Sequence, residues 1–134
     1  MITVTYEGGD RLRIQARSHV LVADQPVADG GADEGPTPTE LFVASLAACV
    51  AHYAQRFLRR HGLSSDGLRV TSNYRWAENP HRVGAIDLEV SAPGLPDGKR
   101  QAFARVIERC TVHSSITHEP SIRINLVEGR TAAA

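Results

Sequence analysis

The chain has 134 residues, of which 42% are hydrophobic and 22% charged, and this size and composition predict one globular domain over residues 1–134. Fifteen Lys and Arg side chains balance fifteen Asp and Glu side chains, so a basic footprint for nucleic acid is not expected. The N-terminus lacks the regions of a signal peptide, and the longest apolar stretch, 41–51, is too short to span a bilayer. We therefore expect a soluble, cytoplasmic protein that binds neither nucleic acid nor membranes.

Three short strand patterns open the chain. Residues 2–6 are rich in β-branched side chains and lead into a turn sequence at 8–10. Residues 11–17 alternate polar and apolar side chains, and residues 19–24 form a third run. These patterns predict an antiparallel meander with one covered face and one solvated face.

A long helix is predicted after a Gly- and Pro-rich loop at 25–37, which is long enough to suggest a functional segment. Thr37 suits the N-cap, Pro38 suits the first helical position, and Glu40 completes a capping box. No helix breaker follows before Gly62, so the helix should be roughly 36 Å long at about 1.5 Å per residue.

The first half of this helix, residues 41–51, is apolar on nearly every side. Such a helix must be buried all round, whereas the sheet of a small monomer covers one side only. A second subunit is the simplest source of the remaining cover, so we expect a homodimer.

The C-terminal half predicts two further strands and two further helical pieces. The strands are expected over 68–76 and 83–91, and a second helix should end at about Cys110. A short helical turn is expected over 111–117, and the alternation in 121–127 predicts a last strand. The tail, 131–134, is expected to be frayed. The predicted fold is α+β, with antiparallel sheets around a long central helix.

Two cysteines are the residues best suited to carry chemistry. The cytosol keeps thiols reduced, so a permanent structural disulfide is not expected, and each cysteine alone fits a small buried hydrophobe. Cys49 lies among alanines in the central helix. Cys110 lies at the junction of two helical pieces, beside Arg109 and three residues before His113. If Cys110 caps the second piece, the backbone N–H groups there favour its thiolate.

Three segments resemble motifs of the OsmC/Ohr family of thiol-dependent organic hydroperoxide reductases. Residues 35–49, GPTPTELFVASLAAC, are similar to the central helix of that family. Residues 17–26, followed by glycines at 30–31, are similar to the lead-in of the OsmC-like branch. Residues 110–116, CTVHSSI, resemble the second cysteine motif. The order and spacing of these blocks match over about residues 11–127.

The resemblance implies an OsmC-like fold in which two subunits intertwine around their central helices and form two active sites at the interface. It implies that Cys49 is the peroxidatic cysteine and Cys110 the resolving cysteine. The implied substrate is an organic hydroperoxide, and the implied reductant is a dithiol such as a lipoyl group or a lipoylated protein. No metal or other cofactor is implied. Burial alone would leave Cys49 inert, so a cation is needed to stabilise its thiolate. The resemblance makes Arg17 the candidate for this cation. The alternative is that Arg17 simply lies on the solvated face of a strand.

The sequence departs from the better-known branch of this family at two positions. An acidic residue there stands ten positions before the first cysteine and holds the arginine, but here that position is Thr39. The acid is Glu40, nine positions before Cys49, which is a candidate site residue with a capping role as its structural explanation. Thr111 stands where relatives often have Pro, a loss that should be minor because Pro only preorganises the helix start.

Two other interpretations stay open. The first is a metal-binding module with soft N and S ligands, although its spacing lacks a second close pair. The second is a non-catalytic dimer that binds a hydrophobic small molecule at its interface. His19 and His113 lie within the family-like motifs and are further candidates to line a site. The candidate metal ligands are Cys49, Cys110, His113 and His118.

Overall fold

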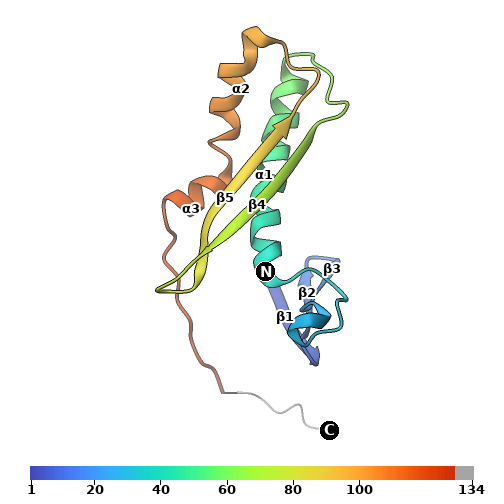
Figure 1. Ribbon diagram of the computed structural model, residues 1–134, viewed down its shortest axis with the longest axis vertical. Helices are drawn as coiled ribbons and strands as arrows, with labels where there is room; N and C mark the ends of the chain where they lie inside the picture. The colour runs from blue at the N-terminus through green and yellow to red at the C-terminus, as the bar shows by residue number, and fades with distance from the viewer. Residues whose placement is uncertain (129–134) are drawn as a thin grey trace.

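The computed structural model describes residues 1–128 and shows an α+β domain built around one long helix (Figure 1). The sheets are the meander β1–β2–β3 and the hairpin β4–β5, both antiparallel, as the sequence predicted. The expected fraying of 131–134 lies outside the described residues. In chain order, the elements are β1 (Ile2–Gly8), β2 (Arg11–Ala16), β3 (His19–Ala23), a 3₁₀ turn (Val27–Asp29), α1 (Pro38–Arg60), β4 (Arg69–Ala77), β5 (Arg82–Ser91), a second 3₁₀ turn (Asp97–Lys99), α2 (Arg100–Ile107) and α3 (Thr111–Thr117).

Helix α1 begins and ends at the residues that its local chemistry favours. Thr37 Oγ1 accepts a hydrogen bond from the Glu40 N–H at 3.1 Å, and Glu40 Oε2 accepts one from the Thr37 N–H at 2.7 Å. This reciprocal capping box satisfies N–H groups that the first turn leaves without helical partners. At the other end Gly62 has φ 64°, a left-handed conformation, and its N–H donates to the carbonyl of Arg59. The caps place Cys49 near the middle of the helix.

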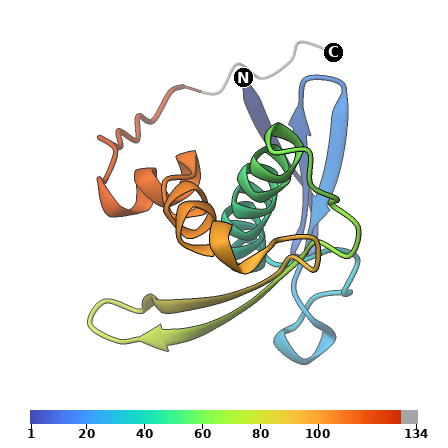
Figure 2. The ribbon, with the colours of Figure 1, turned by 90° about the horizontal axis from the view of Figure 1, so that it is seen from above.

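The core forms where α1 packs against the hairpin and the two later helices. Figure 2 shows β4–β5 along one side of α1, with α2 and α3 on another side. By length and composition alone α1 could cross a membrane, but these contacts are those of a core helix. The C-terminal half of α1 packs against α2, and its middle packs against β4, β5 and the start of α3. The buried side chains of these two clusters are Leu46, Val50, Ala54, Phe57, Leu58, Phe103 and Cys110.

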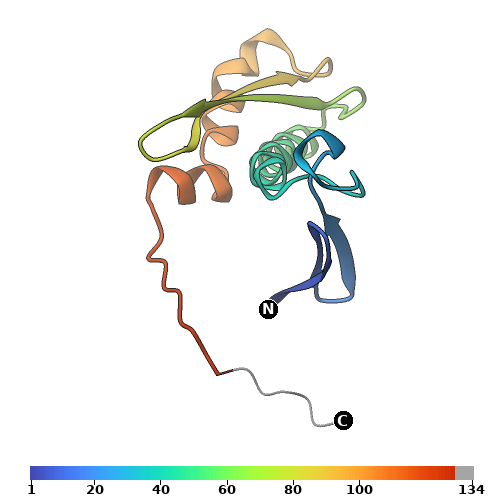
Figure 3. The same cartoon turned by 60° about the horizontal axis from the view of Figure 1, so that its bottom comes forward.

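The N-terminal sheet does not cover α1 in the same chain. Figure 3 shows β1–β3 projecting away from the starting end of the helix, and its strands pack chiefly on one another. The side chains of Ile2, Val4 and Tyr6 lie on one face of β1 and are 70%, 55% and 69% exposed. Within residues 1–128, the predicted covered face of this meander therefore has no cover.

The predicted strand at 121–127 is wrong for the single chain. Residues 118–128 run without regular structure after α3, and Ile122, Ile124 and Leu126 are almost fully exposed. A strand needs a neighbouring strand to satisfy its N–H and C=O groups, and the described part of the chain places none beside this segment. The alternating pattern suits a strand, but within residues 1–128 no other strand lies beside this segment to pair with it.

Residues 41–51 were expected to be buried on all sides, but in the single chain only one side of this half of the helix is buried. Val43, Leu46 and Val50 are buried, whereas a second stripe of the helix is exposed. Apart from Phe42, which is 42% exposed, the exposed residues of this half are small and leave room for another helix or sheet to approach closely. These small residues, which form the small-residue stripe, are Ala44, Ser45 and Ala48.

Asp24 organises the long loop that leads into α1. It is 1% exposed, and its carboxylate accepts hydrogen bonds from the N–H groups of Gln25 at 2.8 Å, Glu34 at 3.1 Å and Ala32 at 3.2 Å. The N–H groups of Glu34 and Gln25 hold the pKa of Asp24 below its usual range, and burial opposes them. The loop is therefore tied down by one charged side chain.

We expect this carboxylate to make stability depend on acid pH. Because the folded-state pKa of Asp24 is lowered, its contribution is present above the unfolded value of about 4 and is lost as pH falls through the folded value. Asp24→Asn should lower the thermal midpoint near neutral pH and flatten its decline in acid, as followed by circular dichroism. Asp29→Asn, an exposed position in the same loop, is the control. Equal acid sensitivity of the wild type and Asp24→Asn would contradict this role.

Candidate active site

Cys110 is the N-cap of α3, as the sequence suggested. Its backbone is extended, with φ −63° and ψ 151°, and its Sγ accepts a hydrogen bond from the N–H of His113 at 3.4 Å. Helix α2 ends at Ile107, so residues 108–110 form a short link rather than the continued helix expected from the sequence. This break turns the Cys110 side chain into the core, where it is 0% exposed.

Cys49 faces the same helix start from α1. Its Sγ accepts a hydrogen bond from the N–H of Val112 at 3.5 Å, and its side chain is half-buried. Both sulfurs therefore lie at the first turn of α3, where backbone N–H groups point at them. Both cysteines are free thiols in this structure. The structure brings the two predicted cysteines together.

The environment distinguishes the two thiols. Burial is the largest influence and raises the pKa of Cys110, while the His113 N–H partly offsets it. Hydrogen bonding and charge from the Cys49 sulfur raise the pKa of Cys110 further, and the Val112 N–H lowers it. Cys110 is thus a protonated thiol at neutral pH, shielded from solvent. Cys49 is the thiol that solvent and small molecules can reach.

A hydrogen bond between α1 and α3 lies next to the cysteines and was not foreseen from the sequence. The Tyr53 hydroxyl and Thr111 Oγ1 are 2.9 Å apart. Tyr53 is one helical turn after Cys49 on the same face of α1, and Thr111 directly follows Cys110. The spacing of Tyr53 from Cys49 was visible in the sequence, but the partner of its hydroxyl depends on the packing of α3.

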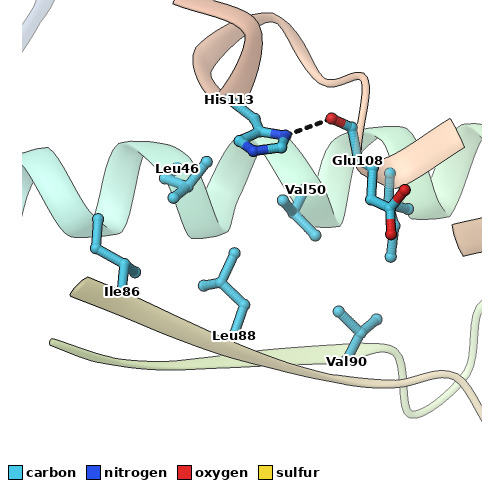
Figure 4. A pocket seen from close by; sticks show the side chains of 8 residues that line it. Leu46, Val50, Ile86, Leu88, Val90, Glu108 and His113 are labelled. Atoms are coloured by element: carbon cyan, nitrogen blue, oxygen red, sulfur yellow. Dashed lines mark hydrogen bonds between the residues drawn. The ribbon is translucent and has the colours of Figure 1, made fainter. Parts of the chain in front are cut away.

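An apolar cavity of about 270 Å³ lies between α1 and β5, with His113 of α3 at its edge (Figure 4). Leu46 and Val50 line it and also belong to the buried cluster that contains Cys110. His113 enters it from α3, and its Nδ1–H donates to the carbonyl of Glu108. The remaining lining residues are Ile86, Leu88, Val90, Ile107 and Glu108.

Arg17 and Glu40 lie apart from the cysteines of the same chain. Arg17 is not on a strand face as expected; it lies in the tight turn between β2 and β3, with φ 56° and an exposed side chain. Glu40 is exposed and forms the capping box, about 13.5 Å from Cys49 along the helix axis at 1.5 Å per residue. The chain by itself therefore joins Cys49 to neither residue.

The other candidates do not gather at one point. His19 is exposed at the start of β3, and His118 hydrogen-bonds within α3. Within residues 1–128, no three His, Cys, Asp or Glu side chains are placed to hold a metal ion. The metal-binding interpretation therefore has no geometric support in the described chain.

A long core helix that holds one accessible thiol against a second, buried thiol at a helix start defines a dithiol protein of the α+β class. The chain belongs to the OsmC-like protein family, whose model matches residues 30–125. No curated protein matches the sequence significantly.

Solved structures share this fold over most of their length. A putative osmotic stress induced and detoxification response protein from Psychrobacter arcticus is 25% identical, with a TM-score of 0.78 and 85% of each chain covered. An OsmC-like protein from Mycoplasma pneumoniae is 17% identical, with a TM-score of 0.73, over 89% of this chain and 87% of its own. The organic hydroperoxide resistance protein OhrB of Bacillus subtilis is 20% identical, with a TM-score of 0.61, over 89% and 92%.

Proposed function

We propose that this protein is a cytoplasmic, cysteine-based peroxidase that reduces organic hydroperoxides. One observation carries the proposal: the only two cysteines, 61 positions apart, meet at the first turn of α3 with unequal exposure. Cys49, the accessible thiol, is the peroxidatic cysteine, and the buried Cys110 is the resolving cysteine. The family includes organic hydroperoxide resistance proteins, which supports the same assignment.

The proposed cycle has three balanced steps. The Cys49 thiolate attacks the peroxide oxygen of ROOH, the O–O bond breaks, and with one proton the products are Cys49–SOH and ROH. Cys110–SH then attacks the oxidised sulfur, giving the Cys49–Cys110 disulfide and water. An external dithiol reduces this disulfide, becomes a disulfide itself and restores both thiols.

The surroundings of the thiols favour an organic peroxide over hydrogen peroxide. The side chains packed with the cysteines are mainly aliphatic, including Leu46, Val50, Val70 and Val112. Burying the alkyl group of a substrate against such side chains makes the free energy of binding more favourable, whereas hydrogen peroxide offers no apolar surface to bury.

The proposal is tested by steady-state turnover of purified protein. Cumene or tert-butyl hydroperoxide should be consumed when dihydrolipoamide is supplied, and more efficiently than hydrogen peroxide at equal concentration. A protein whose thiols oxidise no faster than free cysteine with every organic hydroperoxide tried is not a peroxidase.

We further propose that the active form is an intertwined homodimer. Three apolar surfaces of the single chain lack cover: one face of β1, the small-residue stripe of α1, and the segment 121–127. Exposed, unpaired strands with apolar faces are templates for pairing with another chain. The N-terminal sheet and C-terminal segment of one protomer would cover the central helix of the other.

Light scattering at micromolar concentration is expected to give about twice the 14.5 kDa chain mass. Ile124→Lys should shift the protein toward monomer, because a charge then lies on the apolar side of the segment. Asn125→Lys places the same charge on the other side of the alternation and should leave the dimer intact. A folded wild-type monomer at these concentrations would rule out the dimer.

The cavity in Figure 4 favours a second candidate function, the binding of an apolar small molecule without catalysis. The turnover assay separates the two functions, since a binding protein would consume no peroxide. Titration with a fluorescent apolar probe such as 1-anilinonaphthalene-8-sulfonate would then show saturable binding. Filling the cavity with Leu88→Trp should abolish this binding, and unchanged binding would exclude the cavity as the ligand site.

A further inference from the structure

The start of α3 is fastened to α1 by a hydrogen bond that involves neither cysteine. The Tyr53 hydroxyl and Thr111 Oγ1 lie 2.9 Å apart, although the two residues are 58 positions apart in the chain. Each is the neighbour of a cysteine, because Tyr53 lies one turn beyond Cys49 and Thr111 directly follows Cys110. The bond thus joins the two cysteine-bearing segments beside the sulfur pair.

The other contacts between these segments are less directional. The hydrogen bond from the Val112 N–H to Cys49 Sγ is 3.5 Å long, and sulfur is a weak acceptor. Cys110 itself meets α1 through apolar contacts with Leu46 and Val50, which resist sliding less than a hydrogen bond does. Of the two hydrogen bonds between α1 and α3 in the described chain, the shorter Tyr53–Thr111 bond is therefore the stronger directional restraint.

Helix α3 is short, and besides this bond it is held by the packing of Cys110 and Val112 and by the His113 hydrogen bond to the Glu108 carbonyl. It is seven residues long, Thr111–Thr117, and only the link 108–110 connects it to α2. The segment after it, 118–128, has no regular structure in the described chain. A pivot of this short helix would move the Cys110 sulfur, since Cys110 is its N-cap.

We propose that Tyr53 and Thr111 are positioning residues that hold Cys110 within reach of Cys49 while the disulfide closes. This inference rests on the proposed peroxidase cycle for the origin of Cys49–SOH. In the closing step the S–S bond forms, the S–O bond breaks, and oxygen leaves as water with the proton of Cys110. In competition, a second ROOH converts Cys49–SOH to the sulfinic acid Cys49–SO₂H and becomes ROH. Holding Cys110 in place favours the first route, because intramolecular rates depend on orientation.

The ratio of disulfide to sulfinic acid tests this proposal. The Tyr53–Thr111 hydrogen bond is called the clamp below. Wild type, Tyr53→Phe and Thr111→Val are treated with excess cumene hydroperoxide, quenched, and analysed by mass spectrometry for disulfide and sulfinic acid. Each variant should lower the disulfide-to-sulfinate ratio about five- to tenfold, the scale expected when one hydrogen bond is lost. The double variant should be no worse than either single variant, because both remove the same bond. Thr111→Ser keeps the hydroxyl and should restore the wild-type ratio.

A matched control separates the clamp from general loosening of α3. Ser115 Oγ donates to the Thr111 carbonyl inside α3 and does not reach α1 through that bond, so Ser115→Ala should leave the product ratio unchanged. Equal effects of Ser115→Ala and Thr111→Val would overturn the proposal, as would unchanged ratios in Tyr53→Phe and Thr111→Val. Circular dichroism confirms that each variant is folded.

A second measurement keeps the clamp testable if the peroxidase proposal fails. The protein is equilibrated with mixtures of lipoate and dihydrolipoate, and the oxidised fraction is measured by thiol alkylation. Loss of the clamp should make the disulfide easier to reduce, shifting the equilibrium about fivefold, because the two thiols are no longer held together. If the wild type forms the disulfide in these lipoate mixtures but not with peroxide, the peroxidase proposal is rejected and the clamp is not. No shift in Tyr53→Phe, or no disulfide in the wild type, would reject the clamp.

Discussion

Cys49→Ser is expected to end hydroperoxide turnover, reducing it to the background reaction of dithiol with peroxide. A serine hydroxyl forms no sulfenic acid, and Cys110 cannot replace Cys49 because it is 0% exposed and its pKa is raised by burial. The measurement is the steady-state consumption of cumene hydroperoxide with dihydrolipoamide. Substantial turnover in Cys49→Ser would reverse the roles assigned to the two thiols.

Cys110→Ser should separate the first step from the second. Cys49 still reacts, so a rapid burst of about one equivalent of alcohol per subunit is expected, followed by slow turnover limited by direct attack of the external thiol. The stalled sulfenic acid should be trapped by dimedone and detected by mass. Wild-type protein, which has only these two cysteines, should instead give a disulfide within one chain on a non-reducing gel. A disulfide between chains would contradict the geometry at α3.

The parts of the fold that follow from local chemistry could be predicted from the sequence. The capping box at Thr37 and Glu40 and the glycine at 62 set the ends of α1, and both devices appear in the structure. The meander and the hairpin follow from alternation and turn residues. The segment 121–127 could not be placed in this way, because its pattern shows that it suits a strand but says nothing about which strand would pair with it.

The candidate site was predictable only in part, for the same reason. The pairing of Cys49 with Cys110 was expected from motif resemblance, and the structure brings both to one helix start. The Tyr53–Thr111 bond could not be predicted, because it depends on where α3 packs along α1. Arg17 was expected on a strand face, but the chain turns one residue earlier, and its neighbours in an assembly depend on contacts that one chain does not contain.

Arg17 has a specific consequence for the proposed dimer. It lies at the β2–β3 turn of a sheet that projects away from its own central helix, so we expect it to reach Cys49 of the other protomer. A guanidinium near the sulfur favours the thiolate, so Arg17→Ala should slow the reaction of Cys49 with peroxide about ten- to a hundredfold. Stopped-flow measurement of thiol loss reports this step. Arg13→Ala, which removes a half-buried arginine from β2, should have little effect.

Mixed dimers show which protomer supplies the arginine. Consider a dimer of one Cys49→Ser chain and one Arg17→Ala chain. If each site takes Arg17 from its partner, the site at residue 49 of the Cys49→Ser chain carries both substitutions. The site of the Arg17→Ala chain then has Cys49 and the partner's intact Arg17. Such hybrids, purified through two different affinity tags, should recover about half of the wild-type activity, because one of two equivalent sites is complete. If each site uses its own Arg17, every site carries one lesion, and the hybrid stays at or below the Arg17→Ala level. That second result would refute arginine exchange across the interface and require the N-terminal sheet to fold back onto its own helix in solution.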